Sequence, residues 1–345
     1  MTSPTLDPVD RMLLEELERH LPLDHRPFEV LAEKVTISEQ DCLERVIRLK
    51  AHGAIRRIGG LFDAGALGYH EALLAMRVPS GRLDDAAAVL ARYPGASSVQ
   101  ARNDPFNLWC ALAVPPVDGL EQVARTLETL LKAEETIVLP PLRVYKAGTD
   151  LDLGGLDGAV EDGEPPTSRV LPRFALSEAD IRVIRLLQED LPLLELPFAV
   201  WAEQIESTED ELFAWIKRME HVGVLRRMAA ILPPRPSGRP ITTTLVWQIP
   251  GERVDMIGAQ MALIREVGYC CQRPVGPAWP YPLFTGIQTE TETGWMEVVQ
   301  RIQERIGPYP HKHFFSLKTY KKSRVTYFDP FLETWWREVG SRAEV

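Results

Sequence analysis

The strongest constraint on the fold is an internal repeat that runs through most of the chain. Ala54–Gly60 reads AIRRIGG and Val224–Ala230 reads VLRRMAA, so Arg56-Arg57 in the first half aligns with Arg226-Arg227 in the second. Further along, Leu142–Lys146 (LRVYK) matches Leu317–Lys321 (LKTYK) at a slightly longer spacing. We therefore expect two similar halves that associate within one chain, as identical subunits do in a twofold dimer.

Composition limits the class of protein and its partners. Of the 345 residues, 45% are hydrophobic and 26% are charged, which is typical of a globular protein. No segment approaches the ~18–20 apolar residues of a membrane span, and no secretory signal is visible. The four cysteines show no CxxC spacing, which favours a reducing, cytoplasmic location. The net charge of −10 argues against a duplex-DNA partner.

The first part of each half predicts a winged helix-turn-helix. Asp7–Arg19, Phe28–Lys34 and Ser38–Lys50 carry the apolar spacing of amphipathic helices, and the first and third begin at capping residues. Ile55–Ile58 and Ala66–Tyr69 follow as two short strands around a turn, which would form the wing.

The second part of each half predicts a ferredoxin-like βαββαβ domain. Its expected elements in the first half are the strand Ala72–Pro79, the helix Asp84–Tyr93, the strands Ser97–Asn103 and Leu108–Val114, the helix Leu120–Leu131 and the strand Thr136–Lys146. Helices cover one face of such a sheet and leave the other free for a partner sheet. The expected fold is therefore α+β, a tandem repeat whose two sheets pack face to face.

The pattern divides the chain into six segments. We expect winged domains at residues 1–69 and 173–238, ferredoxin-like domains at 70–147 and 239–328, a linker rich in Gly, Asp and Pro at 148–172, and a tail at 329–345. The tail carries Trp335 and Trp336 and is expected to dock on the body of the protein.

Several motifs resemble the sirohaem decarboxylases, an Ahb-like family whose layout is that of the Lrp/AsnC regulators. Ile55–Phe62 (IRRIGGLF) and Arg102–Trp109 (RNDPFNLW) look like the small, Nir-D-like subunit. Cys271–Phe284 (CQRPVGPAWPYPLF) and Ser316–Phe328 (SLKTYKKSRVTYF) look like the large, Nir-L-like subunit. The resemblance covers nearly the whole chain and implies a form in which both subunits are fused.

This resemblance implies a carboxy-lyase that uses no organic cofactor. Two acetate side chains of sirohaem would lose CO2 without an oxidant to give 12,18-didecarboxysirohaem, in haem d1 or alternative haem biosynthesis. The implied partners are sirohaem, its product and neighbouring enzymes of tetrapyrrole synthesis. Further self-association as a homodimer stays open.

A flat iron macrocycle with several carboxylates requires apolar walls and cations at the rim. We expect Arg273 and Arg102 to hold carboxylates, and Tyr281, Tyr320 and Lys318 to be candidate proton donors, since arginine is a poor acid. The residues expected to bind substrate are Arg56, Arg57, Asn103, Trp109, Arg143, Lys146, Arg226, Arg227, Trp279, Lys321, Lys322 and Arg324. The arginines of the wings could instead face solvent, and Trp109 could belong to the core.

The sequence departs from the family at the second strand of each ferredoxin-like domain. Relatives carry histidine there, whereas this chain has Ser97–Gln100 and Gly268–Cys271. Candidate iron ligands are then His70, His311 and His313, and a thiolate from Cys270 or Cys271 is an alternative. Which half carries catalysis stays open, although the second half has the richer aromatic and lysine lining.

Two other functions compete with this hypothesis. A DNA-binding regulator predicts basic recognition helices, but the corresponding helices begin with the acidic runs Glu39–Asp41 and Glu209–Glu211. A non-catalytic tetrapyrrole-binding protein would explain the missing histidines.

Overall fold

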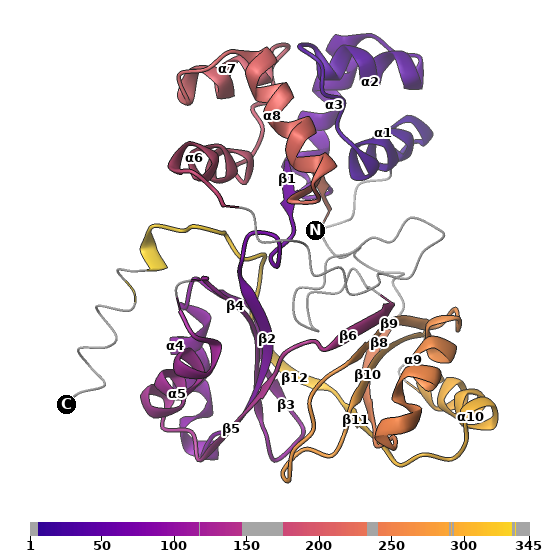
Figure 1. The fold of residues 1–345 in the computed structure, drawn as a ribbon. Coiled ribbons are helices and arrows are strands. Elements are labelled where there is room, and N and C mark those ends of the chain that lie inside the picture. The colour runs from indigo at the N-terminus through magenta and orange to yellow at the C-terminus, as the bar shows by residue number, and fades with distance from the viewer. Residues whose placement is uncertain are drawn as a thin grey trace. The chain divides into compact units, whose positions relative to one another are not determined.

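A computed structural model describes residues 6–116, 118–146, 175–232, 241–289, 291, 293–332 and 335. The chain divides into two compact units, and each unit takes one segment from each half of the repeat (Figure 1). The first unit consists of residues 1–67 and 171–239, and the second of residues 68–170 and 240–345. Corresponding segments of the two halves therefore associate with each other in the same unit. Within the described residues no helix is long and apolar enough to cross a membrane.

The first unit contains two copies of a three-helix domain. Its elements are α1 (Pro8–Arg19), α2 (Pro27–Val35), α3 (Glu39–Ala51) and β1 (Arg57–Phe62), followed in the second half by α6 (Glu178–Leu187), α7 (Pro197–Gln204), α8 (Glu209–His221) and β7 (Leu225–Ile231). Capping explains where the helices begin: the Asp7 side chain accepts a hydrogen bond from the Asp10 backbone at 2.7 Å, and Thr208 caps α8 in the same way.

The predicted hairpin of the first wing was wrong. β1 pairs antiparallel with β7 of the other half, with Arg57 opposite Ile231. Ala66–Tyr69, expected as the second strand of the first wing, lies outside any strand, because the Asp63 carboxylate accepts a hydrogen bond from the Ala66 backbone at 2.9 Å and holds a turn there. β1 thus pairs with a strand of the other half, whereas it was expected to pair within its own half.

The second unit contains two five-stranded sheets. The first has the order β12-β3-β4-β2-β5, built from β2 (His70–Arg77), β3 (Ala96–Arg102), β4 (Leu108–Val114) and β5 (Glu135–Leu139), with α4 (Leu83–Ala91) and α5 (Leu120–Leu131). The second has the order β11-β8-β10-β9-β6, built from β8 (Ile241–Trp247), β9 (Val267–Gln272), β10 (Leu283–Thr289) and β11 (His311–Phe314), with α9 (Val254–Ala262) and α10 (Gly294–Ile306). The βαββαβ order is the predicted one.

The last strand of each half crosses into the sheet of the other half. The segment Thr136–Lys146, predicted as one strand, is two: β5 stays in the first sheet, whereas β6 (Arg143–Lys146) pairs with β9 in the second. Pro140 and Pro141 separate them, since proline cannot donate a ladder hydrogen bond. In the second half, β12 (Ser316–Lys322) likewise pairs with β3.

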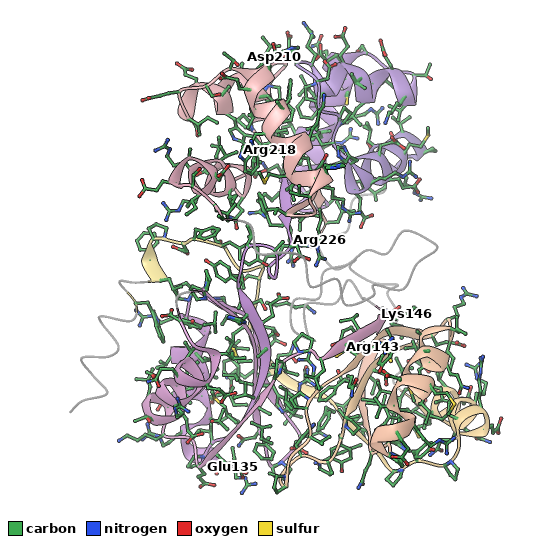
Figure 2. All side chains as sticks on the ribbon, viewed as in Figure 1. Glu135, Arg143, Lys146, Asp210, Arg218 and Arg226 are labelled. Carbon is green, nitrogen blue, oxygen red and sulfur yellow. The ribbon has the colours of Figure 1, made fainter. Side chains whose placement is uncertain are left out.

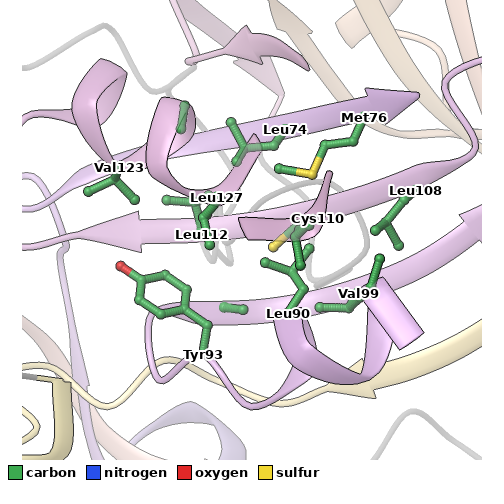
Figure 3. Packing of buried hydrophobic residues seen from close by; sticks show 14 of the residues in the cluster. Leu74, Met76, Leu90, Tyr93, Val99, Leu108, Cys110, Leu112, Val123 and Leu127 are labelled. Atoms are coloured by element: carbon green, nitrogen blue, oxygen red, sulfur yellow. The ribbon is translucent and has the colours of Figure 1, made fainter. Parts of the chain in front are cut away.

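Alternation along the strands creates two kinds of core. On the helix-covered face of the first sheet, Leu74, Val99, Cys110 and Leu127 pack together (Figure 3). On the opposite face, a cluster shared by the two sheets contains Leu73, Ala75, Phe106, Trp109, Ala111, Leu139, Val246, Tyr269, Cys271, Trp279, Phe284 and Phe314, and is called here the inter-sheet cluster. The sheets therefore pack face to face through a largely aromatic layer.

The tail contributes one described aromatic contact. The Trp335 ring lies 4.7 Å from the ring of Tyr93, between centroids, which fits the expected docking of the tail. Trp336 and the predicted linker at residues 148–172 lie outside the described residues.

Two histidines connect the halves of the first unit. His20 Nε2 lies 3.0 Å from Glu220 Oε1, and His25 Nδ1 lies 3.1 Å from Glu209 Oε2. These hydrogen bonds raise the pKa of both histidines; Asp210 and Asp24 add to the effect at His25, whereas Arg227 opposes it at His20. Their stabilising contribution is therefore complete below the unfolded pKa of about 6.5 and is lost as pH rises through the folded value.

We predict that the melting temperature of the wild type falls as the pH is raised from about 6 to about 8. The double variant His20→Gln/His25→Gln should melt lower than the wild type at about pH 6, and the difference should vanish at about pH 8. Differential scanning calorimetry measures both, with His221→Gln, which removes an exposed histidine of α8, as the control. A constant difference across this pH range would contradict the prediction.

Candidate functional site

Two buried arginines occupy equivalent positions on the facing surfaces of the two sheets. Arg102 ends β3 and is 3% exposed, and Arg273 directly follows β9 and is 1% exposed. The two arginines align in the repeat, and each lies next to strand residues that face the inter-sheet cluster. Both residues were predicted to hold carboxylates, and the structure brings them to the same layer.

Arg102 is surrounded by polar groups and aromatic rings. Its Nη2 donates to Gln100 Oε1 at 3.2 Å, and its guanidinium lies 5.1 Å from the centre of the Trp109 ring. The Gln100 amide in turn donates to Ser98 Oγ at 3.2 Å and accepts from the Ser316 hydroxyl of the exchanged strand. These contacts orient the guanidinium against the face of an aromatic ring.

Arg273 has different neighbours. Its Nη2 donates to the Tyr269 hydroxyl at 3.1 Å, its Nη1 donates to the Leu139 carbonyl, and its guanidinium lies 5.4 Å from the Phe284 ring centre. The Tyr269 oxygen is 2.6 Å from Cys271 Sγ. Burial raises the pKa of the Tyr269 phenol well above its usual range, while Arg273 opposes that rise, so the phenol keeps its proton near neutral pH.

The two arginines therefore lie in equivalent aromatic surroundings but have different polar neighbours. In the repeat, Trp109 corresponds to Phe284 and Leu139 to Phe314. By contrast, Gln100 corresponds to Cys271. This difference falls in the two strand runs where the family resemblance expects histidine.

Gln100 and Tyr269 were not predicted as site residues and belong to the two strand runs that lack histidine. Alternation along the strands from Arg102 and Arg273 would have placed both on the same face as the arginines. The alternation of side chains along the strand could therefore have predicted these two neighbours, although no sequence motif does.

Five of the predicted site residues fasten the exchanged strands. Lys318 Nζ lies 2.6 Å from Asp84 Oδ1, and the Tyr320 hydroxyl donates to the same carboxylate at the start of α4. In the other half, the equivalent Arg143 lies 2.9 Å from Asp255 at the start of α9. Tyr145, which matches Tyr320, donates to Asp255 at 2.6 Å. Lys146 and Lys321 complete the pattern, as described next.

Two lysines bind backbone carbonyls beyond the helices. Lys146 Nζ donates to the Ile264 carbonyl at 3.1 Å, and Lys321 Nζ donates to the Tyr93 carbonyl at 2.9 Å. Burial lowers the pKa of both lysines. Arg143 and Lys146 are both labelled on β6 (Figure 2). The LRVYK and LKTYK motifs thus have a structural role, which the repeat alone does not predict.

Other predicted substrate-binding residues lie nearby. The Asn103 side chain accepts a hydrogen bond from the Phe315 backbone at 2.8 Å, at the break between β11 and β12. Lys322 ends β12 opposite Ser98, and Arg324 follows it, partly buried. Trp279 and Tyr281 belong to the inter-sheet layer, with ring centroids 5.3 Å apart.

The three candidate histidines lie on the helix-covered faces. The His311 ring is 5.0 Å from Trp247 and the His313 ring is 4.5 Å from Trp295, between centroids, and both tryptophans belong to the core under α9 and α10. His70 shares a face of β2 with Leu74. These three side chains therefore point away from the space between the sheets, so they could not bind the iron of a macrocycle bound there. Among the described residues no cluster of three His, Cys, Asp or Glu side chains could hold a metal ion.

The two cysteines that are alternative thiolate ligands, Cys270 and Cys271, face opposite sides of β9. Cys270 faces the helix-covered core, where burial raises the pKa of its thiol well above the usual range. Cys271 faces the inter-sheet cluster beside Tyr269. Only Cys271 of this pair therefore lies on the face of the buried arginines.

The predicted arginines of the wings belong to the first unit. Arg226 Nη2 lies 2.9 Å from Asp63 Oδ2, Arg57 donates to the Gln188 carbonyl, and Arg56 is exposed (Figure 2 labels Arg226). Arg227 follows on β7, partly buried. A role of these four residues in substrate binding stays a prediction.

The presumed recognition helices carry acidic first turns that are already paired. Glu39 at the start of α3 forms an ion pair with Arg26, and Glu209 at the start of α8 contacts His25. A helix that reads DNA presents its N-terminal residues to base edges. Paired carboxylates at those positions disfavour the regulator hypothesis.

Comparison with known proteins decides the family. A model described as "AsnC-like ligand binding domain" matches residues 66–146 and 237–321, and one described as "Siroheme decarboxylase NirDL-like HTH domain" matches residues 10–56 and 180–226. The siroheme decarboxylase of Hydrogenobacter thermophilus is 30% identical over 330 residues, which cover 95% of this chain and 98% of that protein. The chain belongs to the sirohaem decarboxylase family.

Solved structures of sirohaem decarboxylases agree with this assignment. The crystal structure of the siroheme decarboxylase NirDL has a TM-score of 0.80 at 27% identity and covers 98% of this chain and 100% of its own. A crystal structure of the siroheme decarboxylase NirDL in co-complex with an iron-uroporphyrin III analogue has a TM-score of 0.79 at 27% identity, and covers 97% of this chain and 99% of its own. The fused architecture, with two helix-turn-helix and two AsnC-like domains, is therefore that of this family.

We predict that the contacts of the exchanged strands stabilise the fold. Tyr145→Phe removes the hydrogen bond to Asp255 and should lower the free energy of unfolding by about 1 kcal/mol. Tyr309→Phe is the matched control, because within the described residues the buried Tyr309 hydroxyl has no hydrogen-bond partner; its free energy of unfolding should stay constant or rise. Urea titration measures both variants, and equal losses would contradict the prediction.

Proposed function

We propose that this protein decarboxylates sirohaem to 12,18-didecarboxysirohaem, as a carboxy-lyase of haem d1 or alternative haem biosynthesis. The observation that carries the proposal is the pair of buried arginines, Arg102 and Arg273, at equivalent positions of an aromatic layer between two sheets. A relative with the same architecture was crystallised with an iron-uroporphyrin III analogue, which is also an iron macrocycle rich in carboxylates. In the proposed reaction the iron belongs to the substrate.

The arginines supply what the first step requires. Decarboxylation starts from an ionised carboxylate, and a guanidinium stays charged at all ordinary pH values while it binds a carboxylate through two parallel hydrogen bonds. Aromatic surroundings lower the local dielectric and strengthen this attraction. Two such groups on facing sheets suit a substrate from which two acetates must be chosen.

The bond changes need only a proton. The bond between the acetate methylene and its carboxyl carbon breaks, CO2 leaves, and the electron pair stays on the methylene carbon, delocalised into the macrocycle. A proton then adds to that carbon, so each acetate becomes a methyl group and no oxidant is consumed. The enzyme must therefore hold one acidic proton near each reacting methylene.

Tyr281 and Tyr269 are the donors that the geometry favours. Tyr281 is partly buried at the edge of the inter-sheet cluster, and Tyr269 accepts a hydrogen bond from Arg273 within the same site. Tyr320 and Lys318 are engaged with Asp84 on α4 and are less suited. Since the second half places the Tyr269 phenol beside its buried arginine, we place the chemistry nearer that half.

Anaerobic incubation of the protein with sirohaem, followed by mass spectrometry, tests the function. We predict a product lighter than sirohaem by two CO2 molecules, with a singly decarboxylated intermediate at early times. A shift of the absorbance spectrum without loss of mass would identify a binding protein instead. Retention of genomic DNA fragments with no effect on sirohaem would favour a regulator.

Variants of the second half test the roles of its residues. Arg273→Lys keeps the charge but loses the two-pronged geometry, and should lower turnover about 10- to 100-fold. Tyr281→Phe should lower turnover while the affinity for sirohaem stays close to that of the wild type. Circular dichroism confirms that each variant is folded, and wild-type kinetics in both would place the reaction elsewhere.

A further inference from the structure

The loop between β9 and β10 is longer than its counterpart in the first half. Arg102 and Leu108 align with Arg273 and Leu283, so residues 103–107 of the first half correspond to the longer run 274–282 of the second. Most of this proline-rich loop is exposed, yet Trp279 is only 2% exposed. Backbone hydrogen bonds of 2.9 and 3.0 Å between Gly276 and Trp279 fix the turn that carries it.

The indole of Trp279 fills the centre of the inter-sheet cluster. Its ring stacks on Phe284 and on Phe314, with centroids 5.9 Å away in both cases, and meets Trp109 edge-on at 5.5 Å. These neighbours come from both halves of the repeat. An exposed loop of one half therefore delivers a single side chain into the layer that the halves share.

The indole N–H of Trp279 differs from most buried donors in its hydrogen bonding. The Trp279 indole N–H is buried and has no hydrogen-bond partner within the described part of the chain. Other indoles of the protein are satisfied: Trp109 donates to the Phe106 carbonyl at 2.6 Å, and Trp247 donates to the Thr285 hydroxyl at 2.9 Å. A buried donor without an acceptor is costly, and native proteins retain few of them.

The surroundings of this donor indicate what would accept from it. Phe284, which stacks on Trp279, also carries the Arg273 guanidinium at 5.4 Å from its ring centre. The other neighbours of Trp279 are Phe314 and Trp109. The Arg102 guanidinium lies 6.0 Å from the ring centre of Phe314 and 5.1 Å from that of Trp109. The rings around the indole are therefore flanked by two buried guanidinium groups, and an anionic oxygen is the acceptor that such surroundings favour most.

We propose that the Trp279 indole N–H binds a carboxylate of the tetrapyrrole substrate. This inference rests on the proposed function and adds a specificity-determining donor to it. The ligand class is a macrocycle with peripheral carboxylates, one of which accepts from Trp279 while the arginines hold its neighbours. The longer loop of the second half delivers this donor, and the shorter loop of the first half carries no tryptophan at all.

Replacement of Trp279 by 3-benzothienylalanine tests the proposal, because sulfur replaces the N–H while the shape of the ring system is kept. The same replacement of Trp247, on the helix-covered face, is the matched control. Affinity is measured by absorbance titration with iron-uroporphyrin III and with sirohaem, and the melting temperature is measured without ligand. Trp279→Phe provides a second, genetically simple variant.

We expect opposite responses at the two positions. The Trp279 replacement should weaken binding of both macrocycles about tenfold and leave the melting temperature unchanged, since no internal hydrogen bond is lost. The Trp247 replacement should lower the melting temperature and leave the affinity unchanged, since its hydrogen bond to Thr285 is internal.

Three results would overturn the proposal, and they are distinguishable. If the wild type decarboxylates sirohaem but the Trp279 replacement binds both macrocycles as tightly, only this inference fails. If the Trp279 replacement melts lower by as much as the Trp247 replacement, the indole has an acceptor within the fold and the inference also fails. If the wild type neither binds nor decarboxylates sirohaem, the proposed function fails and this inference with it.

Discussion

The exchange of β6 and β12 between the two sheets is the constraint on which the second unit depends. Each exchanged strand is hydrogen-bonded along the edge of the opposite sheet and is fastened to the opposite helix by a charged side chain and a tyrosine. The halves cannot separate without breaking both sheets. The facing surfaces, and with them Arg102 and Arg273, are therefore held in one arrangement, as a site for a rigid macrocycle requires.

Local structure could be predicted from the sequence, but pairing could not. The strand Leu108–Val114 was predicted with its observed bounds, and Asp7 was correctly assigned as a helix cap, because periodicity and capping depend on neighbouring residues. The partners of β1, β6 and β12 were missed, since the alternation of a strand does not encode which edge it joins. Repeats add to this ambiguity, because each half offers an equivalent edge.

The candidate site was also predicted only in part, because the sequence shows residue types but not the contacts that they make. Arg102, Arg273, Trp279 and Tyr281 lie in or beside the inter-sheet cluster, and their roles in binding stay predictions. Lys318 and Tyr320 of the LKTYK motif were predicted to be proton donors, and Lys321 was predicted to bind the substrate. The carboxylate that Lys318 contacts is instead Asp84 of the same chain, and residue type alone does not distinguish a ligand's carboxylate from an internal one.

The two halves serve as an internal comparison of what the site requires. Around the arginines the copies have diverged, with Gln100 in one and Cys271 in the other, and with the longer Trp279 loop in only one. The buried arginine is present in both, although a guanidinium in an aromatic layer is costly to bury and a hydrophobic residue often replaces such a charge without loss of stability. A requirement for carboxylate binding in both halves accounts for this better than a requirement for folding. Proton donation is proposed for the second half, where Tyr269 lies beside the buried Arg273 and Tyr281 lies at the edge of the inter-sheet cluster.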